Sequence, residues 1–377
     1  MKSSVWRTLS GLVMLSLLVA GGGVQQVAHG APYAATGPSH VVHFSWGTFK
    51  LAPRIASKLK NGGTLNYVLS IEGTGIPIFG AAMKAGFDRG IAKDSRRHPI
   101  HGSVIGPIST DVPTQVSQIN SLLGANQIDC LTFEAHAPGP YVGVINKAMS
   151  QGVPVFGVNA DSPQSHRIGF YALNEQAAGA VAGKITGLLI KQKHLKVSKA
   201  ALLTGAPEGP YAQHREIGFM QGLRQEVPGV SFVNSVQTAL GTTYDQATVY
   251  STSRSFITGH SNVQLLFHTD QGVELVGKAI KDLHLTGKVW TSGFNLSPAI
   301  IDEINGGQIL TSIGQGWNKQ EEAGVHACTQ FILNGKVPPS INYLQPVPVT
   351  KNSIQYAPGK FTFKASSMAR SVTTGGA

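Results

Sequence analysis

Residues 288–328 read KVWTSGFNLSPAIIDEINGGQILTSIGQGWNKQEEAGVHAC, and this stretch decides the fold. An apolar run that favours a β-strand ends at Asn295. Ser297-Pro298 has the residue types of a helix N-cap and a first helical position, and Gly306-Gly307 is suited to ending the helix that they start. The stretch therefore predicts a strand followed by a short helix.

The same stretch then repeats the pattern. A second apolar strand is predicted at 308–313, and it leads to Gln315 and Trp317 ahead of another helix. Ligands of parallel sheets bind beyond the carboxyl ends of the strands. Asn295, Gln315 and Trp317 are therefore predicted to contact a small polar molecule.

Strands and helices alternate from Gly63 onward. Four strand–helix units are predicted up to Val158, and a second series begins with a strand at 167–172. Asp111 and Asn174 are predicted helix N-caps. This alternation predicts an α/β fold of two tandem Rossmann-like lobes, each with a parallel sheet between helices.

The N-terminus has the pattern of a secretory signal. A positively charged start precedes the apolar run Leu9–Ala20, and small residues follow, so residues 1–30 are predicted to be a signal peptide. An uncleaved membrane anchor is the alternative interpretation. Residues 31–62 show no long periodic pattern and are predicted to be an extension that links to the folded domain or lies over it. Residues 364–377 are predicted to be a polar tail. The protein is therefore expected to be periplasmic or extracellular.

The charge composition restricts the kinds of partner that the protein can bind. The net charge is +11, from 30 Lys and Arg against 19 Asp and Glu, but the basic residues are scattered without interleaved aromatics. This distribution argues against nucleic acid as a partner. Charged residues make up only 13% of the chain, and a low carboxylate content suggests the hypothesis of an acidic external medium.

The chain has two cysteines, Cys130 and Cys328. Cys130 lies in an apolar strand and Cys328 among helical residues. A domain of this size has enough core to fold without crosslinks. Each cysteine is therefore predicted to be a buried free thiol, with a disulfide between them as the alternative.

No set of residues assembles a catalytic centre. Glu134 and Asp161 follow different predicted strands without an activated nucleophile, so hydrogen bonding is the favoured role. His136 lacks the partner spacing of a metal ligand, and no nucleophile elbow is present. The sequence therefore predicts a protein that is not an enzyme and that has no cofactor and no metal.

Several polar and aromatic residues at other strand ends are candidates for ligand contact. Phe79, in the first turn of a predicted helix, can stack on the C–H face of a sugar or pack in the core. Gln213 and Arg215 lie on the first turns of another helix, and Arg215 can bind hydroxyls or pair with a surface carboxylate. Asp270 is suited both to capping a helix and to accepting hydrogen bonds from hydroxyls.

From about Gly63 to Phe363 the sequence resembles the type I periplasmic substrate-binding proteins of bacterial ABC sugar importers. The ribose- and galactose-binding proteins are of this kind, and the ligand domain of lac-repressor-type regulators has the same fold. The residues that carry the resemblance are Ile76-Pro77-Ile78-Phe79, His214–Phe219, Ser292–Asn295 and the segment from Gln308 to Gly335.

The resemblance implies roles for single residues. Phe79 corresponds to the stacking aromatic of the first lobe, and Gln213 or Arg215 to an arginine of the second. Gln315 matches a glutamine at the hinge. Three positions differ from the family pattern. Asn159 and Asn295 stand where the family commonly has aspartate, and Thr269, beside Asp270, replaces an asparagine. Because two carboxylates become amides, the identity of the sugar stays open among carbohydrates, polyols, sugar acids and furanosyl signals.

The family also implies an organisation and a mechanism. Three crossings near residues 172, 315 and 343 give a first lobe of 63–172 plus 316–343 and a second lobe of 173–315 plus 344–363. Hinge closure on a small carbohydrate and delivery to the permease subunits of an ABC importer are the expected functions, with the protein a monomer. Presentation of a sugar-like signal to a membrane receptor or histidine kinase is the alternative. A regulator is disfavoured because residues 31–62 contain no helix-turn-helix.

Overall fold

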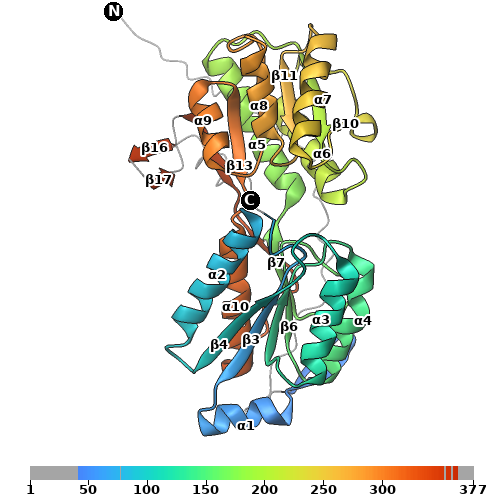
Figure 1. Cartoon of the computed structure of the whole chain (residues 1–377), viewed down its shortest axis with the longest axis vertical. Helices are drawn as coiled ribbons and strands as arrows, with labels where there is room; N and C mark the ends of the chain where they lie inside the picture. The colour runs from blue at the N-terminus through green and yellow to red at the C-terminus, as the bar shows by residue number, and fades with distance from the viewer. Residues whose placement is uncertain (1–40, 77, 352–353, 358–359, 364–377) are drawn as a thin grey trace, which may run out of the picture. The chain divides into compact units, whose positions relative to one another are not determined.

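Two parallel sheets with helices on both faces make up most of the protein (Figure 1). The computed structural model describes residues 41–76, 78–351, 354–357 and 360–363. The predicted signal peptide and the polar tail lie outside these residues. The α/β class with two parallel sheets is confirmed.

The first sheet has six parallel strands in the order β14-β7-β6-β5-β3-β4. The strands are β3 (Leu65–Ser70), β4 (Ile100–Ile105), β5 (Cys130–Phe133), β6 (Val155–Val158), β7 (Gly169–Leu173) and β14 (Asn342–Leu344). Helices α2 (Phe79–Asp94) and α10 (Trp317–Asn334) pack together on one face, and α3 (Val112–Gly124) and α4 (Pro138–Ser150) pack together on the other (Figure 1).

The second sheet has seven strands. They are β8 (Lys199–Thr204), β9 (Ser231–Phe232), β10 (Leu240–Gly241), β11 (Leu265–His268), β12 (Trp290–Phe294), β13 (Ile309–Gly314) and β15 (Val347–Val349), and only β15 runs antiparallel to its neighbour. One helix layer is α5 (Glu175–Gln192) with α6 (Pro210–Glu226). The other is α7 (Gln246–Gly259), α8 (Val273–Asp282) and α9 (Pro298–Gly306). The chain passes between the sheets after β7, after β13 and after β14.

Local sequence signals explain where several helices begin. The side chains of Asp111, Asn174 and Ser297 accept hydrogen bonds from backbone N–H groups of the first turns of α3, α5 and α9, as predicted. Gly179 on α5 has another role, because a Cβ there would collide with the backbone of Arg215 on α6. The glycine lets the two helices approach closely and so fixes the position of Arg215.

Residues 41–62 are not a linker, which corrects the sequence prediction. They form a hairpin of β1 (Val41–Phe44) and β2 (Gly47–Lys50) and then helix α1 (Pro53–Asn61). Val42, Phe49 and Ile55 are buried in the same core as the six-stranded sheet. Asp129, which is fully buried, binds Arg54 and Lys58 of α1. The strands and the helix are too short for their periodicity to have been recognised.

The segment after α6 contains little extended structure. Only Ser231–Phe232 pairs in the sheet, followed by a 3-10 helix at Val236–Thr238 and then β10. β10 is a strand of two residues that the sequence did not reveal. The carboxyl end of β10 was therefore not recognised as a place for ligand-contacting residues.

The cysteines form a disulfide, which overturns the prediction of two free thiols. Cys130 on β5 and Cys328 on α10 are joined, with a Cα–Cα distance of 6.0 Å. Both are buried in the core of the six-stranded sheet. The sequence prediction failed because 198 residues separate the two cysteines and only the fold brings α10 onto β5. The crosslink ties this helix covalently to the sheet.

We expect loss of the disulfide to destabilise the protein measurably. A crosslink between distant residues restricts the unfolded chain and typically contributes about 2–4 kcal/mol. The free energy of unfolding of the double variant Cys130→Ala/Cys328→Ala, measured by denaturant titration, should be lower than that of the wild type by this amount. The reduced wild type should behave like the variant. Two titratable thiols in the denatured, unreduced wild type would contradict the crosslink.

Candidate ligand-binding site

A buried arginine organises the carboxyl end of the seven-stranded sheet. Arg215 on α6 is only 3% exposed. Its Nε donates to a Glu175 carboxylate oxygen (2.6 Å), Nη1 to the Thr269 carbonyl (2.8 Å) and Nη2 to Oε1 of Gln315 (2.9 Å). Burial by itself lowers the pKa of this guanidinium, but Glu175 and Asp270 raise the pKa overall, so Arg215 stays charged.

The network continues through two amides. Nε2 of Gln315 donates to Oδ1 of Asn295 (2.6 Å), and both side chains are 8% exposed. Asn295 has φ of 76°, in the left-handed region that asparagine tolerates better than most residues. Asn159, beyond β6, has φ of 60°. This backbone conformation aims both asparagine side chains from the strand ends, where asparagine is among the residues that adopt it most readily.

Asp270 completes the network beyond β11. Its carboxylate accepts hydrogen bonds from the Gly205 backbone N–H (3.1 Å) and from the Thr269 hydroxyl (2.7 Å). Nη1 of Arg215 lies 3.8 Å from Oδ1 of Asp270. The structure thus brings four predicted site residues together: Arg215, Asp270, Asn295 and Gln315. Their polar atoms form one connected, almost fully buried group.

Two tyrosines in this group were not predicted as site residues. The Tyr211 hydroxyl donates to Oδ1 of Asp270 (3.1 Å) and is hydrogen-bonded to the Tyr244 hydroxyl. The Arg215 guanidinium also lies over the Tyr211 ring, 4.9 Å from its centroid. Tyr244 follows β10 and is 60% exposed. Tyr211 is in the first turn of α6, which is the signal that sequence reasoning could have used.

Two aromatic rings meet beyond the six-stranded sheet. Phe79, at the start of α2, is 6% exposed and contacts Trp317, at the start of α10. The ring centroids are 5.3 Å apart and the planes are nearly perpendicular, at 87°. Both rings are therefore held in place by each other, and Trp317 connects this pair to Gln315, two residues earlier in the chain.

Carboxylates gather beyond β3 and β5. Glu134 is 1% exposed and accepts a hydrogen bond from the Glu72 backbone N–H (3.2 Å). Burial and the nearby Glu72 raise the pKa of Glu134 well above its usual value, while a hydrogen bond from Asn159 opposes the shift. Nδ1 of His136 lies 2.8 Å from a Glu72 oxygen, and the hydrogen bond to Glu72 raises the pKa of His136. The potential ligand atoms of Glu72, Glu134 and His136 all lie within 4.8 Å of one another, a grouping that sequence spacing did not indicate.

Two candidate residues have local partners instead. Nε2 of Gln213 donates to the Pro207 carbonyl (3.0 Å), and the side chain is not part of the Arg215 network. Asp161 forms an ion pair with Arg167. For Asp161 this agrees with the preference for hydrogen bonding over acid–base catalysis.

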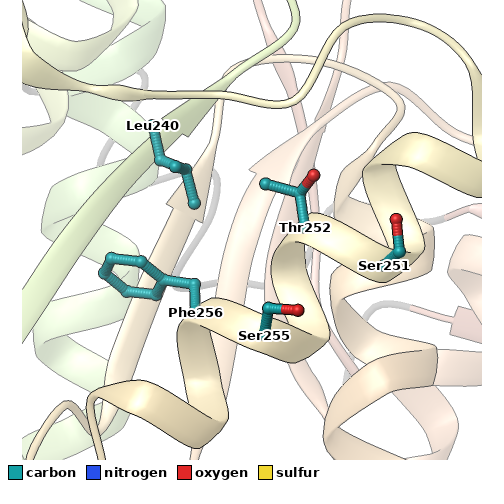
Figure 2. Close-up of a pocket in the computed structure, with 5 residues that line it drawn as sticks. All are labelled: Leu240, Ser251, Thr252, Ser255 and Phe256. Atoms are coloured by element: carbon teal, nitrogen blue, oxygen red, sulfur yellow. The ribbon is translucent and has the colours of Figure 1, made fainter.

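A surface hollow elsewhere on the seven-stranded sheet contains none of the predicted residues. It has a volume of about 370 Å³ and is lined by Leu240, Ser251, Thr252, Ser255 and Phe256. Figure 2 shows that Leu240 comes from β10 and that the other four side chains come from α7. The hollow has no charged side chain to orient a ligand, so the buried polar network is the better candidate.

Two further buried carboxyls, Glu216 and Glu321, form no ion pair among the described residues. Burial raises the pKa of Glu216 on α6 to about 8 and that of Glu321 on α10 to about 8. Glu321 accepts a hydrogen bond from the Thr132 hydroxyl (2.6 Å), and its second oxygen has no partner among the described residues. Burial therefore favours the protonated form of both carboxyls.

These features define a class of protein: two parallel α/β sheets joined by three chain crossings, with amide, guanidinium and carboxylate groups beyond the strand ends. Within the described residues, no helix has the length and apolar character needed to cross a bilayer. The sequence profile described as "Periplasmic binding protein domain" matches residues 67–336. The chain belongs to this family of binding proteins. No curated protein sequence matches the chain.

Solved structures with the same fold include sugar-binding proteins. An ABC transporter solute-binding protein from Burkholderia graminis, in complex with D-arabinose, is 21% identical with a TM-score of 0.66, over 77% of this chain and 96% of that one. An arabinose-binding protein from Geobacillus stearothermophilus is 19% identical with a TM-score of 0.66, over 77% and 98% of the two chains. The XylFII–LytSN complex is 21% identical with a TM-score of 0.61, over 77% and 98%. Likeness at these identities shows the fold.

We expect Arg215→Met to destabilise the protein strongly. The change leaves Glu175 and Asp270 without their buried cation, and breaking a buried ion pair typically lowers the free energy of unfolding by about 3–5 kcal/mol. Denaturant unfolding measures this loss. Arg224→Met, at an exposed position of the same helix where the guanidinium contacts, among the described residues, only the Phe232 ring (5.4 Å from its centroid), is the control and should change stability by less than about 1 kcal/mol. Equal effects of the two changes would contradict the organising role of Arg215.

We also expect stability to fall as the pH rises from about 4.5 to 8. The folded-state pKa values of Glu216 and Glu321 are about 8, above the usual 4.5, so the folded protein holds protons that the unfolded chain releases. Their stabilising contribution is complete below about pH 4.5 and is lost as the pH passes through 8. Each group contributes a slope of up to about 1.4 kcal/mol per pH unit.

Comparing Glu321→Gln with the wild type isolates one of these groups. The amide resembles the protonated carboxyl, so the variant should equal the wild type near pH 5 and exceed its stability at pH 8. Unfolding free energies at both pH values give the difference. Glu322→Gln, at a partly exposed neighbour that pairs with Arg89, is the control. An unchanged pH slope in Glu321→Gln would show that Glu321 does not hold a proton.

Proposed function

We propose that the protein is an exported solute-binding protein that captures a small carbohydrate and delivers it to an ABC importer. Binding rather than catalysis is its activity. The observation that carries the proposal is the connected group of Arg215, Asp270, Asn295 and Gln315 beyond the strands of the seven-stranded sheet. Its amides and carboxylate offer both donors and acceptors, the combination that hydroxyl groups need.

The residues of the six-stranded sheet supply the complementary part of the proposed site. Phe79 offers an aromatic ring for the C–H face of a sugar, with Trp317 holding that ring. Glu134 and Asn159 add a carboxyl and an amide from neighbouring strands. A ligand that contacts both groups of residues would be held between two lobes, 63–172 plus 316–343 and 173–315 plus 344–363.

Hinge closure is the proposed mechanism. The three chain crossings would act as the hinge, and a ligand that contacts both lobes only in the closed state shifts the population toward closure. The closed, monomeric protein would be the form that the permease subunits recognise. A micromolar ligand requires a net free energy of only about 8 kcal/mol, within the reach of a few hydrogen bonds and a stacked ring.

A second candidate function is sensing. The fold is shared with the XylFII–LytSN complex, in which a relative is bound to another protein. In this alternative the closed protein presents a sugar-like signal to a membrane receptor or histidine kinase. Loss of sugar uptake by cells that lack the protein supports transport, and retained uptake with a lost response to the sugar supports sensing.

Thermal melting of the full chain against sugars, polyols, sugar acids and amino acids tests the proposal. A carbohydrate present at 100 times its dissociation constant should add about 2.7 kcal/mol to stability. Asn295→Gly should abolish that shift, because glycine tolerates the positive φ while removing the amide. Asn305→Gly, on the exposed side of α9, is the control and should retain it. Shifts with amino acids alone, or with nothing, would refute the carbohydrate assignment.

A further inference from the structure

Three side chains that can bind a metal ion meet beyond two neighbouring strands of the six-stranded sheet. Glu72 follows β3, and Glu134 and His136 follow β5, which pairs with β3 in parallel. One ligand atom of each side chain lies within 4.8 Å of those of the other two. Because 62 residues separate Glu72 from Glu134, only the fold brings the three together.

Fixed contacts hold the two carboxyls beside each other. The backbone N–H of Glu72 donates to a carboxylate oxygen of Glu134 (3.2 Å), and the backbone N–H of Glu134 donates to the Ser70 carbonyl (2.9 Å). Nε2 of the buried Gln115 donates to the Ser70 hydroxyl (3.0 Å) and to the Glu134 carbonyl (3.0 Å), so this amide ties the two strand ends together. Outer contacts of this kind orient the side chains that bind metals in proteins.

The charges of the group favour a cation. Two carboxylates this close repel each other unless a proton or a cation lies beside them. Among the described residues, Glu72 has His136 as its only ion-pair partner, and Glu134 has none. A positive ion in contact with both carboxylates would remove their repulsion.

The contact between His136 and Glu72 has the geometry of two ligands of one ion. Nδ1 of His136 lies 2.8 Å from Oε2 of Glu72, but the two atoms are poorly aligned for a hydrogen bond, and this buried oxygen has no well-directed donor among the described residues. Two atoms that each lie about 2.0–2.2 Å from one zinc ion are about 2.8–3.6 Å apart, and their lone pairs converge on the ion rather than on each other. Small rotations of the side chains bring all three donors to one ion.

We propose that Glu72, Glu134 and His136 form a binding site for a divalent transition-metal ion such as Zn²⁺. The imidazole nitrogen favours such ions over Ca²⁺ and Mg²⁺, which prefer sites made of oxygen atoms. Three protein ligands leave a coordination position for water or another ligand. The side chains of His136 and Glu72 are 47% and 13% exposed, so an ion can reach the buried Glu134 from the His136 side. The inference does not depend on the proposed carbohydrate function.

Calorimetric titration of the full chain with Zn²⁺ tests the site. The protein is first treated with a chelator and dialysed, and the titration is made near neutral pH without sugar. One Zn²⁺ should bind per chain, and equal concentrations of Mg²⁺ or Ca²⁺ should not displace it. Glu72→Gln, Glu134→Gln and His136→Gln each remove one ligand and should each weaken this binding more than about tenfold, since even the loss of an outer contact typically weakens metal binding by about 10–100-fold.

Matched controls separate this site from other histidines and carboxylates. His101→Gln changes an exposed histidine on β4 of the same sheet, and Glu322→Gln changes a carboxylate on α10. Neither should change the affinity for Zn²⁺ by more than about twofold. Melting curves without metal show whether the three ligand variants are folded. Zn²⁺ at 100 times its dissociation constant should raise the melting temperature of the wild type by several degrees and leave that of the folded ligand variants unchanged.

Three results would overturn the proposal. Zn²⁺ binding that the three ligand variants leave unchanged would place the ion elsewhere on the chain. No binding at millimolar Zn²⁺, or equal affinity for Ca²⁺, would exclude a transition-metal site. If His136→Gln lowers the melting temperature by the same amount with and without Zn²⁺, the histidine serves as an ion-pair partner of Glu72 instead. None of these results bears on sugar binding, which the sugar panel measures separately.

Discussion

The Arg215 guanidinium is the interaction on which the candidate site depends. It joins the start of α5 through Glu175, the end of β11 through Thr269 and the end of β13 through Gln315. Rings of Tyr211 and Phe294 lie against it, so its plane is fixed as well as its charge. The guanidinium holds its donors in a rigid planar fork and so fixes the three elements in one geometry, whereas the donors of a lysine rotate on a flexible stem. Gln315 accepts a hydrogen bond from this cation and donates one to Asn295, so the guanidinium orients both amides.

Most of the fold followed from the sequence because its signals are local. Helix caps such as Asp111 and Ser297 and the repeated apolar strands are read within a few residues, and they were read correctly. The disulfide and the α1 ion pairs with Asp129 were missed because they join residues far apart in the chain. The site divides in the same way. Strand-end positions in the sequence identified Asn295 and Gln315. Tyr244 and Glu72 were not identified, because only the fold places Tyr244 beside Tyr211 and Glu72 beside Glu134 and His136.

Three buried carboxyls have raised pKa values and contrast with the buried cation Arg215. Glu134, Glu216 and Glu321 are all buried, and burial raises the pKa of each. Arg215 differs from these carboxyls, because the acidic groups of Glu175 and Asp270 raise its pKa and keep it charged although it is buried. The interior therefore contains both paired and protonated groups, and the second kind is favoured as the surroundings become more acidic.

Helix α10 covers the six-stranded sheet, yet it follows six strands of the seven-stranded sheet in the chain. Strands β3 to β7 are made first, and their covering helix, with its half of the Cys130–Cys328 crosslink, comes only after β13. Neither half is complete until most of the chain has been made, because β14 of the six-stranded sheet and β15 of the seven-stranded sheet both follow α10. The half that begins first can bury its last apolar face only when the other half is almost entirely made, so a chain interrupted before α10 would leave that face open to other chains.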